Sequence, residues 1–141
     1  MYSEIENARI VPICAKVEAD LLELTDPEEK AMFIEELGLK ESGLDLLIKT
    51  AYDLLGLRTF LTCGHDECRA WTFKNGMKAP QCAGVIHTDF EKGFIKAEVY
   101  SFEDLLKYGS EQAVKDNGRY RIEGKEYLMQ DGDICYFRFN V

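Results

Sequence analysis

Charged and aromatic residues are divided unevenly along this chain, and that division most constrains how the chain can fold. From Met1 to Leu57 there are 5 basic and 13 acidic residues, a net charge of −8, and 3 aromatic residues. From Arg58 to Val141 the counts are 12 and 13, a net charge of −1, with 13 aromatic residues. A shift of this size indicates a boundary between regions of different construction. The sequence therefore predicts two regions that meet near Gly56 and Leu57.

Composition excludes several classes of protein. The 141 residues are 46% hydrophobic and 30% charged, with 11 glycines and 3 prolines, which excludes collagen, a disordered tail and a coiled-coil rod. The net charge of −9 argues against a surface coated with nucleic-acid-binding charge. No apolar run approaches the roughly 18 residues of a membrane span. Five cysteines at irregular spacing suit reduced thiols, so we expect a cytoplasmic protein without a membrane partner.

The first region reads as one strand followed by helices. Ile10–Ala15 is a short apolar run without alternation, which is typical of a strand buried on both faces of a parallel sheet. The helices predicted after it are Val17–Leu24, one capped by Asp26 that runs to Leu37, and one capped by Ser42 that ends at Gly56. These residues supply no neighbour for the strand. Either the strand prediction is wrong, or the region is the end of a larger α/β domain.

The second region alternates strands with helices. Predicted strands cover Arg58–Cys63, Glu67–Lys74, Phe94–Tyr100, Tyr120–Ile122, Glu126–Gln130 and Ile134–Asn140. Predicted helical segments cover Pro80–Ile86, Phe102–Leu106, which Ser101 caps, and Glu111–Asp116. Gly64-His65-Asp66 and Asp131-Gly132 are turn signals of hairpins. The order β-β-α-β-α-β-β is that of a ubiquitin-like β-grasp module, so the fold class is α+β.

Two motifs look like functional sites but have plainer explanations. Gly38–Gly43 has the glycine spacing of a phosphate-binding loop, but the Lys and Ser/Thr that this loop requires after its second glycine are absent. Cys63–Cys68, with Cys82 and His87, contains ligand types that suit zinc, but their spacing departs from the usual paired pattern. A hairpin with incidental thiols explains these residues, and zinc binding stays an alternative. We expect no metal site and no catalytic site in this chain.

One set of basic residues is a candidate for contact with a macromolecular partner. They gather around the second predicted strand of the second region, the turn after it and the approach to the next strand, in a module that is otherwise nearly neutral. Scattered lysines also serve solubility, which is the alternative explanation. The five residues are Arg69, Lys74, Lys78, Lys92 and Lys96.

Several strings resemble the C-terminal part of the YchF / Obg-like ATPase family, including its TGS domain. RAWTFKNGMKAPQCAGVIHTDFEKGFIKAEV covers Arg69–Val99, and within it HTDFEKGFI at His87–Ile95 is the most specific string. EGKEYLMQDGDICYFRFNV covers Glu123–Val141, and ESGLDLLIKTAYDLLGLRTF covers Glu41–Phe60. The resemblance extends over nearly the whole chain.

This resemblance implies a three-part cytosolic protein: a P-loop nucleotide-binding domain with a helical insertion, followed by a TGS domain of β-grasp fold. Members of the family look like GTPases, characteristically prefer ATP and associate with ribosomes. TGS domains also occur in threonyl-tRNA synthetases and (p)ppGpp synthetases, where RNA-related roles are usual. By resemblance, residues 1–57 are a mainly helical remnant of the P-loop domain, one strand plus helices, and residues 58–141 are the TGS domain.

The resemblance also accounts for the isolated strand. Ile10–Ala15 would be the last strand of the P-loop sheet, and Cys14-Ala15-Lys16 matches the family's base-contacting Ser/Thr-Ala-Lys loop. Cys14 stands where a hydroxyl residue is usual and is a weaker hydrogen-bond partner. The phosphate loop and the Mg²⁺ ligands would lie outside this sequence. We therefore expect ATP or GTP and Mg²⁺ to bind the full-length parent, and expect neither a cofactor nor hydrolysis in this chain.

The expected partners are a ribosome or another RNA-containing complex, through the TGS domain, and the remainder of the parent P-loop domain. Without its sheet, the strand at Ile10–Ala15 would be disordered, fold back on the helices, or pair with a second copy to form a dimer. A function of another class is a β-grasp sulfur carrier or protein modifier. Such proteins expose a C-terminal Gly-Gly, whereas this chain ends in Phe139-Asn140-Val141.

Overall fold

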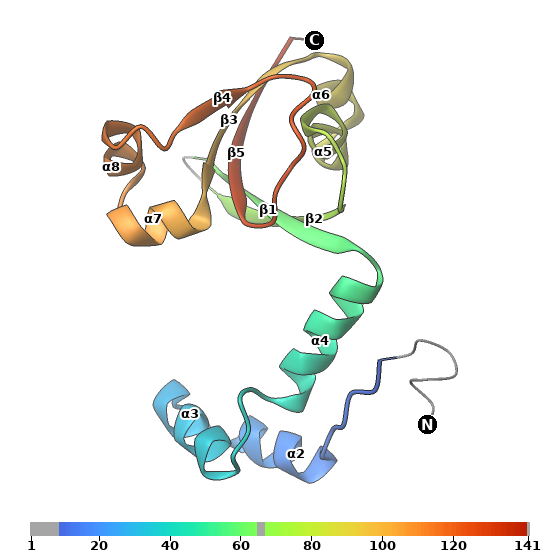
Figure 1. Cartoon of the computed structure of the whole chain (residues 1–141), viewed down its shortest axis with the longest axis vertical. Coiled ribbons are helices and arrows are strands. Elements are labelled where there is room, and N and C mark those ends of the chain that lie inside the picture. The colour runs from blue at the N-terminus through green and yellow to red at the C-terminus, as the bar shows by residue number, and fades with distance from the viewer. Residues whose placement is uncertain (1–8, 65–66, 141) are drawn as a thin grey trace. The chain divides into compact units, whose positions relative to one another are not determined.

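The chain folds into two compact units that divide between Leu55 and Gly56, two residues before the predicted boundary (Figure 1). The structure is a computed structural model and describes residues 9–64 and 67–140. His65 and Asp66, in the predicted hairpin turn, and Val141 lie outside the described residues. Among the described residues, no helix has the length and apolar character needed to cross a bilayer.

In its described part, residues 9–55, the first unit contains three helices: α2 (Ala15–Glu23), α3 (Pro27–Glu36) and α4 (Gly43–Leu54). Both predicted N-caps are confirmed. The Asp26 carboxylate accepts a hydrogen bond from the Glu28 N–H at 3.0 Å, and the Ser42 hydroxyl accepts one from the Asp45 N–H at 3.0 Å. These caps satisfy backbone donors that a helix start leaves unpaired, so they can be identified from the sequence.

The strand predicted at Ile10–Ala15 is wrong. Residues 9–14 have no regular structure, and Ala15 already belongs to α2. A strand needs backbone partners, and the described part of this unit contains no other strand. Instead the segment folds back on the helices: a methyl group added to Gly43, at the start of α4, would lie 3.2 Å from the Ile13 side chain.

The second unit is a mixed sheet of five strands: β1 (Leu57–Cys63), β2 (Cys68–Lys74), β3 (Phe94–Ser101), β4 (Arg121–Glu123) and β5 (Asp133–Phe139). Their spatial order is β2-β1-β5-β3-β4. The first and last strands are neighbours and run parallel, with Leu61 opposite Ile134, and the other neighbouring pairs are antiparallel. The strands β1 and β5, which come first and last in the sequence of this unit, therefore lie side by side within the sheet, and the other strands flank them.

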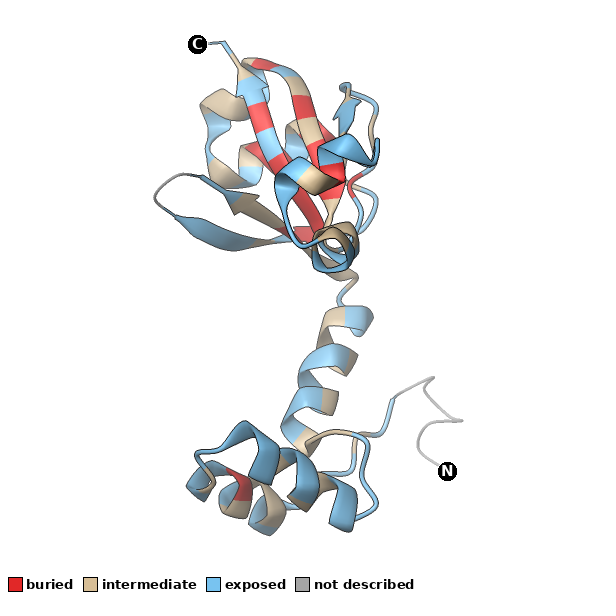
Figure 2. Cartoon of the chain, turned by 90° about the vertical axis from the view of Figure 1, so that its left-hand side faces the viewer, coloured by how far each residue is buried: buried red, intermediate tan, exposed pale blue. Residues whose placement is uncertain are grey.

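Helices cover both faces of this sheet. Helices α5 (Ala79–Ile86) and α6 (Thr88–Lys92) pack on one face, over Cys135 and Phe137. Helices α7 (Phe102–Tyr108) and α8 (Glu111–Asp116) pack on the other, around Ile134. Figure 2 shows the buried residues concentrated in this unit. The larger core contains Phe60, Phe73, Ala79, Cys82, Ala83, Phe94, Ala97, Val99, Met129, Cys135 and Phe137.

Two predictions differ from the structure in this unit. Glu126–Gln130 is not a strand, because only Leu128 forms an isolated bridge, with Lys78. Its backbone pairs instead with the chain just before α5, where the Met129 N–H donates to the Met77 carbonyl at 3.1 Å. Helix α6 was not predicted. It has five residues and is capped by a histidine, whose Nδ1 accepts from the Asp89 N–H at 3.2 Å, so it shows no helical periodicity.

Candidate functional site

The predicted base-contacting residues lie at an exposed helix start. Cys14 precedes α2 in an extended conformation, and its side chain does not cap the helix. Ala15 and Lys16 form the first turn, and all three are exposed. One turn later, the Glu18 carboxylate accepts a hydrogen bond from the Gly43 N–H at 2.7 Å, which ties α2 to the start of α4. The role of Cys14, Ala15 and Lys16 in nucleotide binding stays a prediction.

The five basic candidates do not form one cluster. Arg69 and Lys74 are both on β2 but five residues apart, which separates their Cα atoms by about 17 Å and points the side chains to opposite faces. Lys78 precedes α5, Lys92 ends α6, and Lys96 is on β3, three strands from β2. The structure therefore distributes these residues over several surfaces of the unit.

Ion pairing separates the five candidates into two groups. Lys78 contacts Glu126 at 2.6 Å and Lys96 contacts Glu98 at 3.8 Å, so their charges are partly neutralised. Arg69 lies over the Trp71 ring at 4.3 Å. Among the described residues, Arg69, Lys74 and Lys92 form no ion pair with a carboxylate. These three cations are the most available to an external anion.

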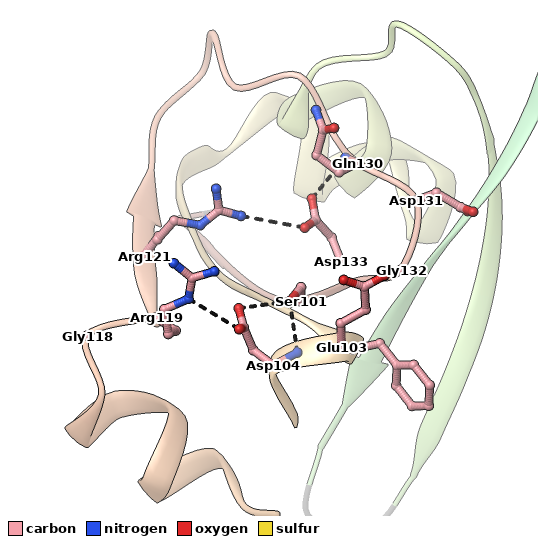
Figure 3. A pocket seen from close by; sticks show the side chains of 11 residues that line it. Ser101, Glu103, Asp104, Gly118, Arg119, Arg121, Gln130, Asp131, Gly132 and Asp133 are labelled. Atoms are coloured by element: carbon pink, nitrogen blue, oxygen red, sulfur yellow. Dashed lines mark hydrogen bonds and ion pairs between the residues drawn. The ribbon is translucent and has the colours of Figure 1, made fainter. Parts of the chain in front are cut away.

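A cavity of about 510 Å³ opens between the start of α7, β4 and the turn before β5 (Figure 3). Its deepest charged group is Asp133, which is 1% exposed. The Asp133 carboxylate accepts hydrogen bonds from the Tyr127 hydroxyl at 2.8 Å and the Gln130 N–H at 2.9 Å, and it lies 3.7 Å from the Arg121 guanidinium. Burial raises the pKa of Asp133, against the opposing effect of these partners.

The other charged groups of this cavity also pair with each other. Arg119 Nε contacts the Asp104 carboxylate at 3.2 Å, and the same carboxylate accepts from the Ser101 hydroxyl at 2.8 Å. The Ser101 hydrogen bond, followed by Arg119, lowers the pKa of Asp104. Asp131 accepts from the Thr59 N–H at 2.8 Å. Because both arginines face carboxylates, the cavity is a polar network that joins elements rather than a site for phosphate.

A second cavity, of about 470 Å³, lies on the face of the sheet that α7 and α8 partly cover. Tyr100 and Tyr120 stack there with ring centroids 5.6 Å apart, and Arg138 lies over the Tyr136 ring at 4.1 Å. Tyr136 is 49% exposed. We call Tyr100, Tyr120, Tyr136 and Arg138 the tyrosine face. Tyr136 and the half-buried Tyr120 give this face aromatic surface, which suits stacking with bases, whereas Tyr100 is buried.

Glu98 organises the tyrosine face. Its carboxylate accepts hydrogen bonds from Arg138 Nε at 3.0 Å and from the Tyr120 hydroxyl at 2.9 Å. The Arg138 hydrogen bond is the main reason that the pKa of Glu98 is lowered. The sequence alone did not indicate this face, because its residues come from two strands, β3 and β5, and from the segment before β4. Alternation in β3 and β5 places Glu98, Tyr136 and Arg138 on one side, but only the register, with Glu98 opposite Tyr136, brings them together.

The zinc alternative gains no geometric support from the described residues. Within residues 9–64 and 67–140, no group of three or more His, Cys, Asp or Glu side chains is arranged to hold a metal ion. Cys82 is fully buried in the core, and His87 caps α6. His65 and Asp66, two further members of that constellation, lie outside the described residues.

Comparison with known proteins places the chain in a family. The family model YchF-GTPase_C, described as "Protein of unknown function (DUF933)", matches residues 57–140. The "Ribosome-binding ATPase YchF" of Bacillus subtilis is 59% identical over 99% of this chain and 38% of its own length. The "Obg-like ATPase 1" of Xenopus laevis is 50% identical over 96% of this chain and 34% of its own length. The chain thus spans little more than a third of these relatives.

Solved structures agree with this assignment. The structure of the Schizosaccharomyces pombe YchF GTPase superposes with a TM-score of 0.78 at 42% identity, over 92% of this chain and 34% of that one. A GTP-binding protein from Pyrococcus horikoshii superposes with a TM-score of 0.64 at 18% identity, over 99% of this chain and 40% of that one, which shows a shared fold. The chain therefore belongs to the YchF / Obg-like ATPase family, and it matches the C-terminal part of that family's proteins.

Proposed function

We propose that this chain is the C-terminal part of a YchF-type ribosome-binding ATPase, and that its second unit is a TGS module of β-grasp fold that docks the parent on the ribosome or another RNA-containing complex. The observation that carries the proposal is the 59% identity, over 99% of the chain, to a protein named for ribosome binding. Nucleotide hydrolysis belongs to the parent and not to this chain, because the sequence of this chain contains no phosphate-binding loop.

The sheet of the second unit supports the β-grasp assignment. Its strand order β2-β1-β5-β3-β4, with the first and last strands parallel at the centre, is the arrangement expected of a ubiquitin-like module. Arg69, Lys74 and Lys92 supply cations that no described carboxylate neutralises. The tyrosine face adds aromatic surface. Cations that meet phosphates and rings that stack on bases are the two components of sequence-tolerant RNA binding.

The first unit supports the proposed contact with the rest of the parent domain. Among residues 9–55 only Leu21 is buried, whereas Leu22 is 80% exposed and Leu44 is 52% exposed. Both line an apolar cavity of about 220 Å³. Apolar surface of this extent needs a cover. In our proposal the parent's P-loop sheet supplies it and also binds ATP or GTP with Mg²⁺. Dimerisation through this surface is the alternative for the isolated chain.

Co-sedimentation of the chain with ribosomes tests the docking role. The triple variant Arg69→Glu, Lys74→Glu, Lys92→Glu should bind about tenfold or more weakly at moderate salt and show a shallower salt dependence, because phosphate contacts release counterions. The matched control is Lys40→Glu, Lys107→Glu, Lys125→Glu, which makes the same change in net charge at other exposed lysines. This control should bind ribosomes as well as the unmodified chain does. Equal binding by both variants would contradict the proposed role of these three cations.

Calorimetry tests the non-catalytic part of the proposal. Titration of ATP and Mg²⁺ into the chain should release no binding heat, because the first region carries a net charge of −8 and a polyphosphate needs positive charge or an amide nest. Micromolar affinity would show that the first unit retains a nucleotide site.

A further inference from the structure

Two cysteines of the second unit lie directly opposite each other. Cys63 ends β1, Cys68 begins β2, and the two are partners in the antiparallel register. Both are exposed. Nothing in the proposed docking function uses them.

The hydrogen-bond phase of the hairpin brings these two side chains together. Antiparallel partners alternate between hydrogen-bonded and non-hydrogen-bonded pairs. At one end of the ladder the Asn75 N–H bonds to the Gly56 carbonyl at 2.8 Å, and at the other the Gly64 N–H bonds to the Glu67 carbonyl at 2.8 Å. Gly56 with Asn75 and Gly64 with Glu67 are therefore both hydrogen-bonded pairs. Counting along the register from either end, Cys63 and Cys68 form a non-hydrogen-bonded pair.

That kind of pair has the separation that a disulfide needs. Cα atoms of a non-hydrogen-bonded pair lie about 4.5 Å apart. Disulfides form across Cα separations of roughly 4.4 to 6.8 Å. Cys68 is also among the groups that raise the pKa of Cys63, in agreement with this close approach. No backbone movement is therefore required to join them.

We propose that Cys63 and Cys68 are an oxidisable cross-strand dithiol, which hydrogen peroxide converts into an intramolecular disulfide. Burial, followed by the hydrogen bond with Cys68, raises the pKa of Cys63 to about 11, so Cys63 keeps its proton at neutral pH. We assign Cys68 as the attacking sulfur. Its thiolate attacks a peroxide oxygen; an S–O bond forms as the O–O bond breaks, and the released hydroxide is protonated to water.

The second step closes the disulfide. The Cys63 sulfur attacks the sulfenic sulfur of Cys68; the S–S bond forms as the S–O bond breaks, and the leaving hydroxide takes the Cys63 proton as water. The two thiols together lose two electrons, and the peroxide is reduced to two water molecules.

The other three cysteines do not share this arrangement. Cys82 and Cys135 are 0% and 3% exposed in the core, and burial raises the pKa of both thiols, that of Cys82 to about 12. Cys14 is exposed but belongs to the first unit. Among the described residues, only Cys63 and Cys68 combine exposure with a thiol partner across a strand pair.

The disulfide would form beside two cavities, one on each face of the sheet. Cys63 lines the cavity of the tyrosine face, and it also lines an apolar cavity of about 320 Å³ on the opposite face, with Phe90 and Phe139. Oxidation would therefore restrain the end of the hairpin next to two exposed surfaces of the unit. The dithiol is independent of ribosome binding, so its test stands apart from the docking proposal.

Peptide mass spectrometry tests the dithiol directly. The full chain is treated with stoichiometric hydrogen peroxide, its remaining thiols are alkylated, and it is digested with trypsin without reduction. Cleavage after Arg58 and Arg69 releases Thr59–Arg69, which contains both cysteines. We expect this peptide to carry no alkyl groups, to be lighter by two hydrogen atoms, and to regain both thiols after dithiothreitol. Two alkyl groups on the peptide, with oxidation at Cys14 instead, would overturn the proposal.

Single variants test the roles of the two sulfurs. In Cys63→Ser, the remaining Cys68 should accumulate sulfenic acid, which dimedone traps. In Cys68→Ser, dimedone should trap less sulfenic acid, because the remaining Cys63 thiol keeps its proton. The Cys14→Ser variant is the matched control and should form the same intramolecular disulfide as the original chain. Stronger trapping in Cys68→Ser than in Cys63→Ser would reverse the assignment, and a Thr59–Arg69 disulfide that depends on Cys14 would refute it.

Discussion

At the scale of single residues, two carboxylates of the second unit respond to their surroundings in opposite directions. Glu98 is held by Arg138 and Tyr120, which favour its charged form and lower its pKa. Asp133 is buried, and the cost of burying its charge raises its pKa in spite of hydrogen bonds from Tyr127 and Gln130. As the pH falls into the acidic range, protonation of Glu98 should therefore lower the free energy of unfolding, and protonation of Asp133 should raise it.

The variant Glu98→Gln isolates the first of these effects. Its free energy of unfolding should be about 1 to 2 kcal/mol lower at pH 7, because charged hydrogen bonds to Arg138 are lost. A lowered pKa contributes stability that is present above the usual glutamate range and lost as the pH falls through the folded value. The deficit should therefore shrink between pH 5 and pH 3. Denaturant unfolding at several pH values measures it.

The control for Glu98→Gln is Glu126→Gln, which removes an equal charge from a side chain that is 85% exposed and paired only with Lys78. Its effect on stability should stay within about 0.5 kcal/mol at every pH. A deficit in Glu98→Gln that is independent of pH would contradict the proposed electrostatic role.

At the scale of elements, the close approach of two backbones joins the start of β3 to the end of β5. Gly93 precedes β3, and its carbonyl accepts a hydrogen bond from the Asn140 N–H at 2.9 Å. The φ of Gly93 is −88°, which any residue adopts. A side chain there would nevertheless overlap the Asn140 carbonyl oxygen. Glycine is needed at this position for space and not for conformation.

We expect Gly93→Ala to lower the free energy of unfolding by about 2 to 4 kcal/mol, because one of the two backbones must move. Thermal unfolding and hydrogen exchange at the β3–β5 ends measure the effect. Gly124→Ala is the matched control: a methyl group there meets nothing within 4 Å, and its φ is not in the left-handed region. Equal loss of stability in both variants would rule out steric overlap as the cause.

At the scale of the whole molecule, the two units differ in how much they bury. The first unit buries only Leu21 among its described residues, whereas the second contains an extended aromatic core around Phe60. Phe60 is fully buried, and its ring lies 5.9 Å from that of Phe73 and 5.8 Å from that of Phe137. Apolar burial is the main source of stability, so the second unit should be the more stable part of the chain.

The units should accordingly unfold separately. Hydrogen exchange with mass spectrometry should show faster exchange across α2, α3 and α4 than across the strands of the second unit. Phe60→Ala should destabilise the second unit by about 3 to 5 kcal/mol and leave exchange in the first unchanged. Leu21→Ala should accelerate exchange in the first unit alone. A loss of protection in both units with either variant would show that they unfold as one.

Several elements could be predicted from the sequence because their signals are local. The caps at Asp26, Ser42 and Ser101 each depend on a few neighbouring residues. The confirmed caps accept backbone hydrogen bonds at about 3 Å, from Glu28 at Asp26, from Asp45 at Ser42 and from Asp104 at Ser101. Family membership was likewise predictable from the strings between Glu41 and Val141, and the comparisons confirm it.

The candidate sites were less predictable. The roles of Cys14, Ala15 and Lys16 and of the five basic residues stay predictions. The tyrosine face was missed entirely. Lys96 illustrates the reason: in the sequence it is one more lysine, but in the sheet it lies opposite Arg138 and close to Glu98, which neutralises part of its charge.

The sequence by itself determined the two-region construction, the starts of α3, α4 and α7, and the family, because composition, capping and motif strings are properties of neighbouring residues. Only the tertiary structure decided that Ile10–Ala15 forms no strand and that Glu126–Gln130 pairs outside the sheet. It also decided which cations remain unpaired and which side chains meet at the tyrosine face. The physical reason is that a strand and an ion pair both require partners. Which distant residue becomes a partner depends on strand order and register, which no local pattern specifies.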